Sequence, residues 1–289
     1  MALIRIPFRV LFPGFIVLAM TGFIGWSIFQ AVTAGHYNSL EKVMVSNGYQ
    51  SEGISRLRMS QFNEAERLLR LADLPENRIY RDRPNATARI WLRGVYVATG
   101  RYAEALKDVE EMLQIVPDGQ LFLEEKKEYE LLIQYRDTAD AVPLIEFINE
   151  FKQNHSKDLP PVRYNPVVSV PAISRILQIY SMIGHHDEGI KLIDEVLNHA
   201  YASDHDISLF KGRFQTSAQA NECVEAGQGG DGIKIDWRAC KWIQRYLEVR
   251  EAFAQDKAEG FKGCAGKKPG EECVGHAMRA LIKSDYFPW

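Results

Sequence analysis

The chain has 289 residues, with 35 lysines and arginines against 38 aspartates and glutamates, which gives a formal net charge of −3. This balance excludes a strongly basic surface of the kind that binds nucleic acid, so we expect no nucleic-acid partner. Beyond the N-terminal segment, about 250 residues remain for soluble structure, enough for one large domain or an array of small units.

The N-terminal segment contains no charged residue over positions 10–40, and Arg5 and Arg9 precede it. Its apolar part is long enough to cross a bilayer, because about 20 helical residues at about 1.5 Å rise span a hydrocarbon core of about 30 Å. We predict a short N-terminus at 1–9 and a transmembrane signal anchor at 10–33. By the positive-inside rule, the N-terminus is cytoplasmic and the body lies in the periplasm or its topological equivalent.

Cleavage of this segment as a signal peptide is the alternative to an anchor, because small residues occupy positions 32–35. The apolar run is longer than the usual signal core of about 7–15 residues, which favours retention as an anchor. Within the anchor, Thr21, Gly22 and Gly25 form a small-residue face suited to packing on another transmembrane helix.

A short motif recurs three times along the chain: a small residue, any residue, a ring-bearing residue, any residue, Glu, and a small residue. The matching positions are Ser60, Phe62, Glu64 and Ala65; Gly100, Tyr102, Glu104 and Ala105; and Gly184, His186, Glu188 and Gly189. The motif predicts a tight turn between two antiparallel helices. The first small residue ends one helix in a left-handed cap, and the acid complements the dipole of the next helix.

With these turns, the chain resembles the tetratricopeptide repeat family. In the best unit, 86–117, the positions that the family pattern favours are held by Leu92, Tyr96, Gly100, Tyr102, Ala105 and Pro117. The unit departs from the pattern where Arg89 takes the early Trp position, with Trp91 two residues later, and where Arg93 takes the Gly position.

The resemblance covers roughly 46–200, with further units beginning at Ser46 and Val170. Residues 120–151 lie one repeat length after the best unit, but Pro143 falls inside the expected second helix, so this stretch is either a degenerate repeat or a plain helical hairpin. We therefore predict tetratricopeptide-like helical repeats over 41–200. A proline-rich loop at 156–171 interrupts them, since four prolines in that stretch disfavour a helix.

The C-terminal region, 201–289, is predicted to be helical at 208–220 and 236–255, with a Gly-rich connection at 227–232. All four cysteines lie here: Cys223, Cys240, Cys264 and Cys273. In an oxidising compartment they indicate two disulfides, and nearest-neighbour pairing is the simplest of three connectivities. The rival interpretation is a zinc site that includes His276. No Cys-x-x-Cys pair supports that site.

No catalytic motif is evident. The cluster at 185–188, two histidines followed by two acids, falls in a predicted turn, and adjacent histidines do not share a helix face as a metal pair spaced by four does. We expect no cofactor and no metal. A helical repeat array mainly offers an extended surface for other proteins.

The sequence thus predicts an all-α fold: a transmembrane helix, a helical-hairpin solenoid, and a disulfide-stapled helical cap. The resemblance implies a non-catalytic scaffold, an accessory or assembly subunit of a membrane complex, that binds protein partners along its concave face. The concave positions carried over from the family are Asn47, Gln50, Arg58, Thr87, Ile90, Ser174 and Gln178. Two alternatives stay open: an envelope enzyme or metal-dependent factor with its site in the C-terminal third, and the same scaffold facing the cytosol or a mitochondrial compartment.

Overall fold

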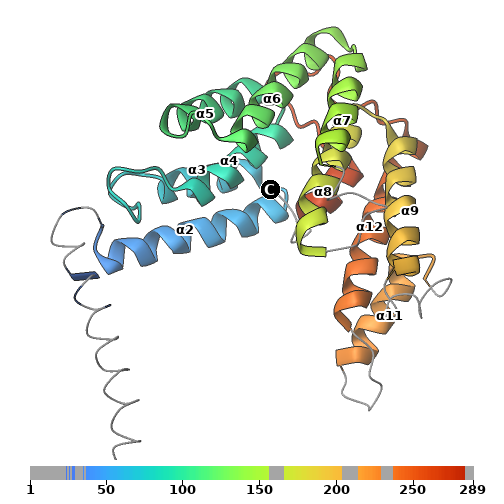
Figure 1. Cartoon of the computed structure of the whole chain (residues 1–289), viewed down its shortest axis with the longest axis horizontal. Helices are drawn as coiled ribbons and strands as arrows, with labels where there is room; N and C mark the ends of the chain where they lie inside the picture. Colours follow the sequence, from blue (N-terminus) through green and yellow to red (C-terminus); the bar gives the residue numbers. More distant parts are fainter. Residues whose placement is uncertain are drawn as a thin grey trace, which may run out of the picture.

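The computed structural model describes residues 37–155, 166–203, 214–228 and 237–283, together with Ile24, Trp26, Ile28, Phe29 and Gly35. Over these residues the regular elements are helices, beside one isolated β-bridge between Tyr37 and Tyr80, so the all-α prediction is confirmed (Figure 1). The helices are α2 (Leu40–Arg58), α3 (Phe62–Ala72), α4 (Ala86–Ala98), α5 (Tyr102–Ile115), α6 (Gln120–Thr138), α7 (Val142–Asn154), α8 (Pro166–Met182), α9 (His186–Ser203), α11 (Ser217–Gln228), α12 (Trp237–Glu259) and α13 (His276–Lys283).

Within the described ranges, no helix combines the length and the apolar character needed to span a bilayer. The predicted N-terminus at 1–9 lies outside these ranges. So does the predicted anchor at 10–33, apart from four single positions between 24 and 29, and the predicted packing residues Thr21, Gly22 and Gly25 lie outside as well.

The three predicted turns join α2 to α3, α4 to α5 and α8 to α9. Ser60, Gly100 and Gly184 adopt left-handed φ angles of 59°, 65° and 72°. In each turn the next amide donates to the carbonyl five residues earlier, at 2.9, 2.8 and 2.9 Å, which is the hydrogen bond of a Schellman cap. The turn motif therefore predicted the local geometry at all three places.

The ring and the second small residue of each motif are buried as the motif requires. Phe62, Tyr102 and His186 are 8%, 0% and 6% exposed. Ala65 and Ala105 are fully buried, and a Cβ on the third small residue, Gly189, would lie 2.6 Å from the ring of Phe253. Each second helix thus approaches its neighbour too closely for a larger side chain.

Prolines and helix ends correct three of the predicted boundaries. Pro143 lies in the first turn of α7 and not in the helix interior, so its missing amide hydrogen costs no helical hydrogen bond. Helix α8 begins at Pro166, where proline is again tolerated in the first turn, so the predicted loop at 156–171 extends too far. The predicted helix at 208–220 overlaps α11, which begins at Ser217 and continues past the predicted end to Gln228, while positions 208–213 lie outside the described residues.

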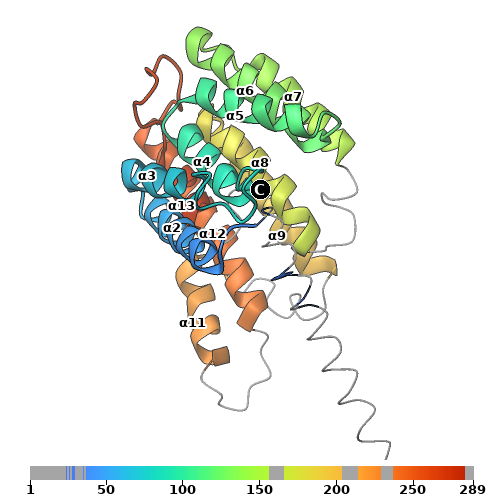
Figure 2. The ribbon, with the colours of Figure 1, turned by 90° about the vertical axis from the view of Figure 1, so that its left-hand side faces the viewer.

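The C-terminal region packs back onto the hairpins. The helices from α2 to α9 form four consecutive hairpins, α2–α3, α4–α5, α6–α7 and α8–α9. Helix α12 contacts α9, α11 and α13. Helix α13 contacts α2 and α8, so it bridges the first and fourth hairpins (Figure 2). Asp256 of α12, 1% exposed, accepts hydrogen bonds from the amides of His276 and Ala277 at 2.6 and 2.9 Å. A carboxylate from another helix thereby caps the N-terminus of α13.

Residues 260–275, which we name the clamp loop, connect α12 to α13 and lie against the C-terminal ends of three helices. Amides of the loop donate to carbonyls that helix termini leave unpaired. The four bonds are Cys273 to Ala98 at 3.4 Å, Gly270 to Thr99 at 3.0 Å, Gly266 to Arg136 at 2.9 Å, and Cys264 to Met182 at 2.8 Å. The loop therefore ties the ends of α4, α6 and α8 together.

Two side chains from the hairpins complete this contact from the other direction. The Tyr135 hydroxyl donates to the Lys262 carbonyl at 3.2 Å, and His186 Nε2 donates to the Phe261 carbonyl at 2.6 Å. Because His186 is the ring residue of the third turn motif, a position predicted only to fill its own turn also anchors the clamp loop.

Two glycines of the clamp loop allow the closeness of this contact to be tested. Gly263 and Gly266 have similar φ angles, 74° and 70°. A Cβ at Gly263 would lie 2.0 Å from the Met182 carbonyl oxygen, whereas a Cβ at Gly266 meets nothing within 4 Å. We predict that Gly266→Ala costs about 1–2 kcal/mol of unfolding free energy from its backbone conformation. Gly263→Ala should cost about 1–3 kcal/mol more, as measured by urea denaturation. Equal losses in the two variants would contradict the docked position of the loop.

Candidate binding surfaces and a buried seam of ion pairs

The structure separates the seven predicted partner-binding residues into accessible and inaccessible ones. Asn47 on α2 and Thr87 on α4 are exposed, and Gln50, Arg58 and Ile90 are half-buried. Ser174 and Gln178 on α8 are buried, with 4% and 6% exposure. They are not accessible to a partner here, because α8 is covered by its contacts with other helices, including α9 and α13.

The chain's own last helix also contacts helices of this predicted surface. α13 contacts α2 and α8, which are the first helices of their hairpins, and the resemblance assigns those helices to the partner-binding surface. The apolar side of α13, formed by Ala277, Met278, Leu281 and Ile282, is buried. A segment of the chain itself therefore covers part of the surface that was predicted to bind a partner.

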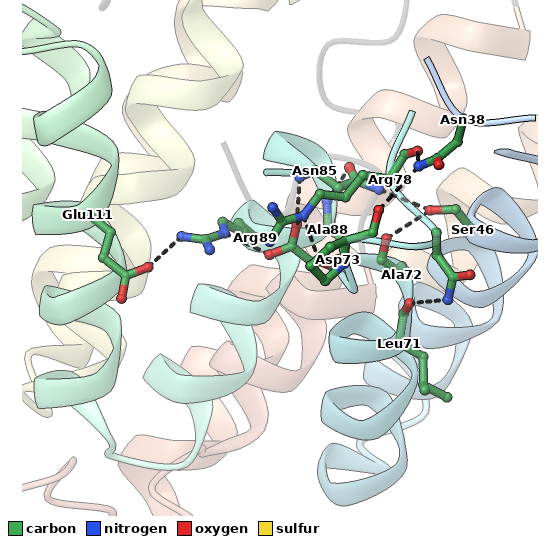
Figure 3. Close-up of polar contacts among 12 residues, drawn as sticks. Asn38, Ser46, Leu71, Ala72, Asp73, Arg78, Asn85, Ala88, Arg89 and Glu111 are labelled. Atoms are coloured by element: carbon green, nitrogen blue, oxygen red, sulfur yellow. Dashed lines mark hydrogen bonds and ion pairs between the residues drawn. The ribbon is translucent and has the colours of Figure 1, made fainter. Parts of the chain in front are cut away.

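A seam of buried charged side chains runs between the hairpins and begins at Asp73, just after α3. Its carboxylate accepts hydrogen bonds from the Asn85 amide at 2.6 Å, from Arg89 Nε at 2.8 Å and from Arg78 Nε at 3.0 Å (Figure 3). Asn85 in turn caps α4 by accepting from the Ala88 amide at 3.1 Å. Asp73 thus fixes the loop between the first two hairpins and the start of α4.

Arginines of α4 carry the seam to α5 and α6. Arg89 Nη1 lies 3.1 Å from Asp108 and 2.9 Å from Glu111. Arg93, with a side chain only 3% exposed, lies 2.8 Å from Asp108 and 3.2 Å from Glu125. Burial raises the pKa of Asp108 and of Glu125, and the neighbouring Arg93 opposes this rise in both. Arg93 is therefore the cation that Asp108 and Glu125 share, and it favours the charged form of both.

Arg175 of α8 continues the seam to the fourth hairpin. Its Nε donates to Glu128 at 2.5 Å, and its Nη1 lies 3.4 Å from Glu124. The guanidinium carbon is 5.1 Å from the centre of the Phe151 ring and 5.9 Å from that of Phe147, within the range of a cation–π interaction. Charged groups thereby join α8 to α6 and α7.

Sequence reasoning located two residues of the seam without recognising their role. Arg89 and Arg93 were noted as departures from the family pattern, and both are seam cations. They stand four residues apart on a helix whose other positions, such as Val95 and Tyr96, are apolar and buried. Two arginines four residues apart share one face of a helix, and on a largely buried helix they need carboxylate partners. This spacing was the signal in the sequence for buried ion pairs. The sequence did not indicate which of its many acids, such as Asp108, they would meet.

Two surface pockets lie near these features. One, of about 590 Å³, opens beside the outer end of the seam and is lined by Arg78, Arg89, Lys107, Glu110 and Glu111 among others. The other, of about 500 Å³, lies between the α2–α3 turn and the clamp loop, with Gln61, Asn63, Thr99 and Gly270 in its wall. Both are lined by mixed charged and polar groups.

The cysteines form the nearest-neighbour disulfides that the sequence favoured. Cys223 pairs with Cys240 and Cys264 with Cys273, at Cα–Cα distances of 5.9 and 5.0 Å. The first joins α11 to α12, and the second closes the clamp loop. These disulfides contradict the rival interpretation of a zinc site, because the four cysteines are bonded to one another in pairs. His276 lies 3.0 Å from Glu259 instead.

The histidine cluster at 185–188 has structural contacts. His186 is buried and bonded to the clamp loop, while His185 lies 3.7 Å from Glu188. Over the residues that the structure describes, no group of three or more His, Cys, Asp or Glu side chains is arranged to hold a metal ion.

No family model matches the chain, and no curated protein or solved structure is significantly similar to it. The resemblance to tetratricopeptide repeats therefore depends on the residues and on the three turns.

We predict that Arg93→Met lowers the free energy of unfolding by about 3–5 kcal/mol, because it leaves Glu125 without its ion-pair partner and Asp108 with Arg89 alone. The variant should recover part of this loss on acidification. Without Arg93 the folded-state pKa values of Asp108 and Glu125 rise further above their unfolded values, so the native state gains protons that the unfolded state lacks.

The measurement is urea denaturation of the wild-type protein and the Arg93→Met variant from neutral to mildly acidic pH. Arg67→Met is the control, since Arg67 pairs with Glu64 on the exposed side of α3. A deficit that does not change with pH, or one no larger than in the control, would contradict the role given to Arg93.

Proposed function

We propose that the chain is a non-catalytic, membrane-anchored scaffold with tetratricopeptide-like hairpins. It would serve as an accessory or assembly subunit of a membrane protein complex and bind a protein partner on the side of the membrane that its body occupies. The packing of consecutive hairpins supports this proposal, because each helix from α2 to α7 contacts the next and the clamp loop ties the ends of α4, α6 and α8 together. Such a body is a rigid support for a binding surface.

The observation that carries the proposal is the contrast between the first two hairpins and the fourth. Asn47 and Thr87 are open to solvent on α2 and α4, whereas their counterparts on α8 are buried. Helices α2 and α4 are neighbours, and the guanidinium of Arg58 lies 5.7 Å from the centre of the Trp91 ring between them. The partner surface is therefore proposed around Asn47, Gln50, Arg58, Thr87 and Ile90.

The disulfides support a body that faces an oxidising compartment, the periplasm or its equivalent. All four half-cystines are less than a tenth exposed. Two buried disulfides are more consistent with an exported domain than with one that folds among cytosolic reductants.

We predict that mild detergent extraction of native membranes, followed by affinity purification of the full-length chain, recovers it with a membrane protein partner. The double variant Asn47→Glu/Thr87→Glu should lose this partner, because two charges at the proposed contact must be desolvated on binding. Gln114→Glu is the matched control, since Gln114 is also exposed and uncharged but lies on α5.

The disulfides and helix content of each variant confirm folding before comparison. Recovery of the wild-type chain alone as a monomer, or an unchanged complex with the double variant, would contradict the proposal.

A further inference from the structure

The first turns of α2 expose apolar side chains that nothing in the described chain covers. Leu40, Met44 and Val45 are 75%, 66% and 43% exposed. Leu40 and Met44 are four residues apart, so they share one face of the helix. Adjacent exposed apolar side chains on one helix face favour a second medium or surface at this end of the body.

Amphipathic aromatic residues stand beside this apolar end. Tyr37 and Tyr80 form the isolated β-bridge, and their ring centres are 4.7 Å apart. The side chain of Asn38 holds the two segments together by donating to the carbonyls of Pro75, at 3.2 Å, and of Arg78. The loop between α3 and α4 is thereby fixed next to the start of α2, as Figure 1 also shows.

The same end carries exposed basic side chains. Lys42, Arg81 and Arg83 are exposed, and the Arg83 guanidinium lies 6.0 Å from the centre of the Tyr80 ring. Exposed acids, Glu41, Glu76 and Asp82, are also present, so basic and acidic residues are equal in number in this set. Apolar side chains, tyrosines and basic groups together are the composition of a protein surface at the headgroup level of a bilayer.

Chain continuity identifies the bilayer as the occupant. The charge-free stretch at 10–40 ends at Leu40, the first residue of α2. The side chains of Ile24, Trp26, Ile28 and Phe29 are each more than half exposed. If the apolar stretch enters a membrane, the first turn of α2 lies immediately at its surface, where a partner protein would have to compete with lipid.

We propose that Leu40, Met44 and Val45, with Tyr37, Tyr80 and the basic side chains beside them, dock on the headgroup surface of the bilayer. The inference rests on the membrane anchor of the proposed function and adds a second contact. The anchor alone allows the body to swivel, whereas a docked α2 fixes its orientation and presents Asn47 and Thr87 just above the lipid.

The test uses the full-length chain in nanodiscs of phosphatidylcholine, with and without phosphatidylglycerol. An environment-sensitive fluorophore is attached at Met44→Cys and, as the matched control, at Ile115→Cys, which is also apolar and 54% exposed but at the end of α5. We expect a blue-shifted emission at position 44 that spin-labelled lipids quench, and neither effect at position 115. Adding Leu40→Glu should reduce the shift at 44, and phosphatidylglycerol should change it little, because the exposed charges at this end of the body balance.

The outcomes separate the two proposals. A chain that stays in the nanodisc with a water-exposed label at 44 overturns the docking and leaves the anchor intact. A chain that does not enter the nanodisc overturns the anchor and the docking with it. A blue shift at 44 that spin-labelled lipids do not quench indicates a protein contact, such as a second copy, and also overturns the docking.

Discussion

Hydrogen bonds from the clamp loop to the ends of α4, α6 and α8 are the interaction on which the arrangement of this body depends. A helix leaves its last carbonyls without intrahelical partners, and a buried unpaired carbonyl is costly. Here one loop supplies amides to three such ends. The bonds require the loop backbone to approach other backbone closely, which explains Gly263 against Met182. The Cys264–Cys273 disulfide restricts the loop to conformations near the docked one.

The clamp loop also determines what remains available for binding. The clamp loop leads directly into α13, whose N-terminus is capped by Asp256. Helix α13 then lies against α2 and α8. Ser174 and Gln178 of the fourth hairpin are buried, whereas Asn47 and Thr87 of the first two hairpins are exposed. In this arrangement the C-terminal region is a structural part of the helical body, and the proposed partner surface is confined to the first two hairpins.

The ion-pair seam acts between the hairpins, where the clamp loop does not reach. Buried ion pairs contribute little net stability because desolvation offsets their attraction, but removing one member is costly. Arg93 must meet both Asp108 and Glu125, and Arg175 must meet Glu128. An array with shifted helices would leave these charges buried and unpaired. We therefore infer that the seam favours one register among apolar packings that are otherwise similar.

The parts of the fold that the sequence predicted are those determined by local chemistry. The turns at Gly100 and Gly184 need a left-handed residue and a buried ring within a few positions, and the short motif contains all of this. The partners of Arg93 and the docking of the clamp loop depend on residues far apart in the chain, so no local pattern reveals them. Pro143 and Pro166 were misplaced because a proline ends a helix or begins one, and the composition of the surrounding stretch does not distinguish the two.

Native-state hydrogen exchange is the most direct test of the clamp loop's role, with Cys264→Ser/Cys273→Ser compared with Cys223→Ser/Cys240→Ser. Loss of the first disulfide should reduce the protection of α13 and of the loop amides at positions 264, 266, 270 and 273. The reason is that a loop without the disulfide loses more conformational entropy when it docks. Loss of the second should affect α11 and leave those amides protected. Unchanged protection of the loop in the first variant, or equal loss in both, would contradict the account.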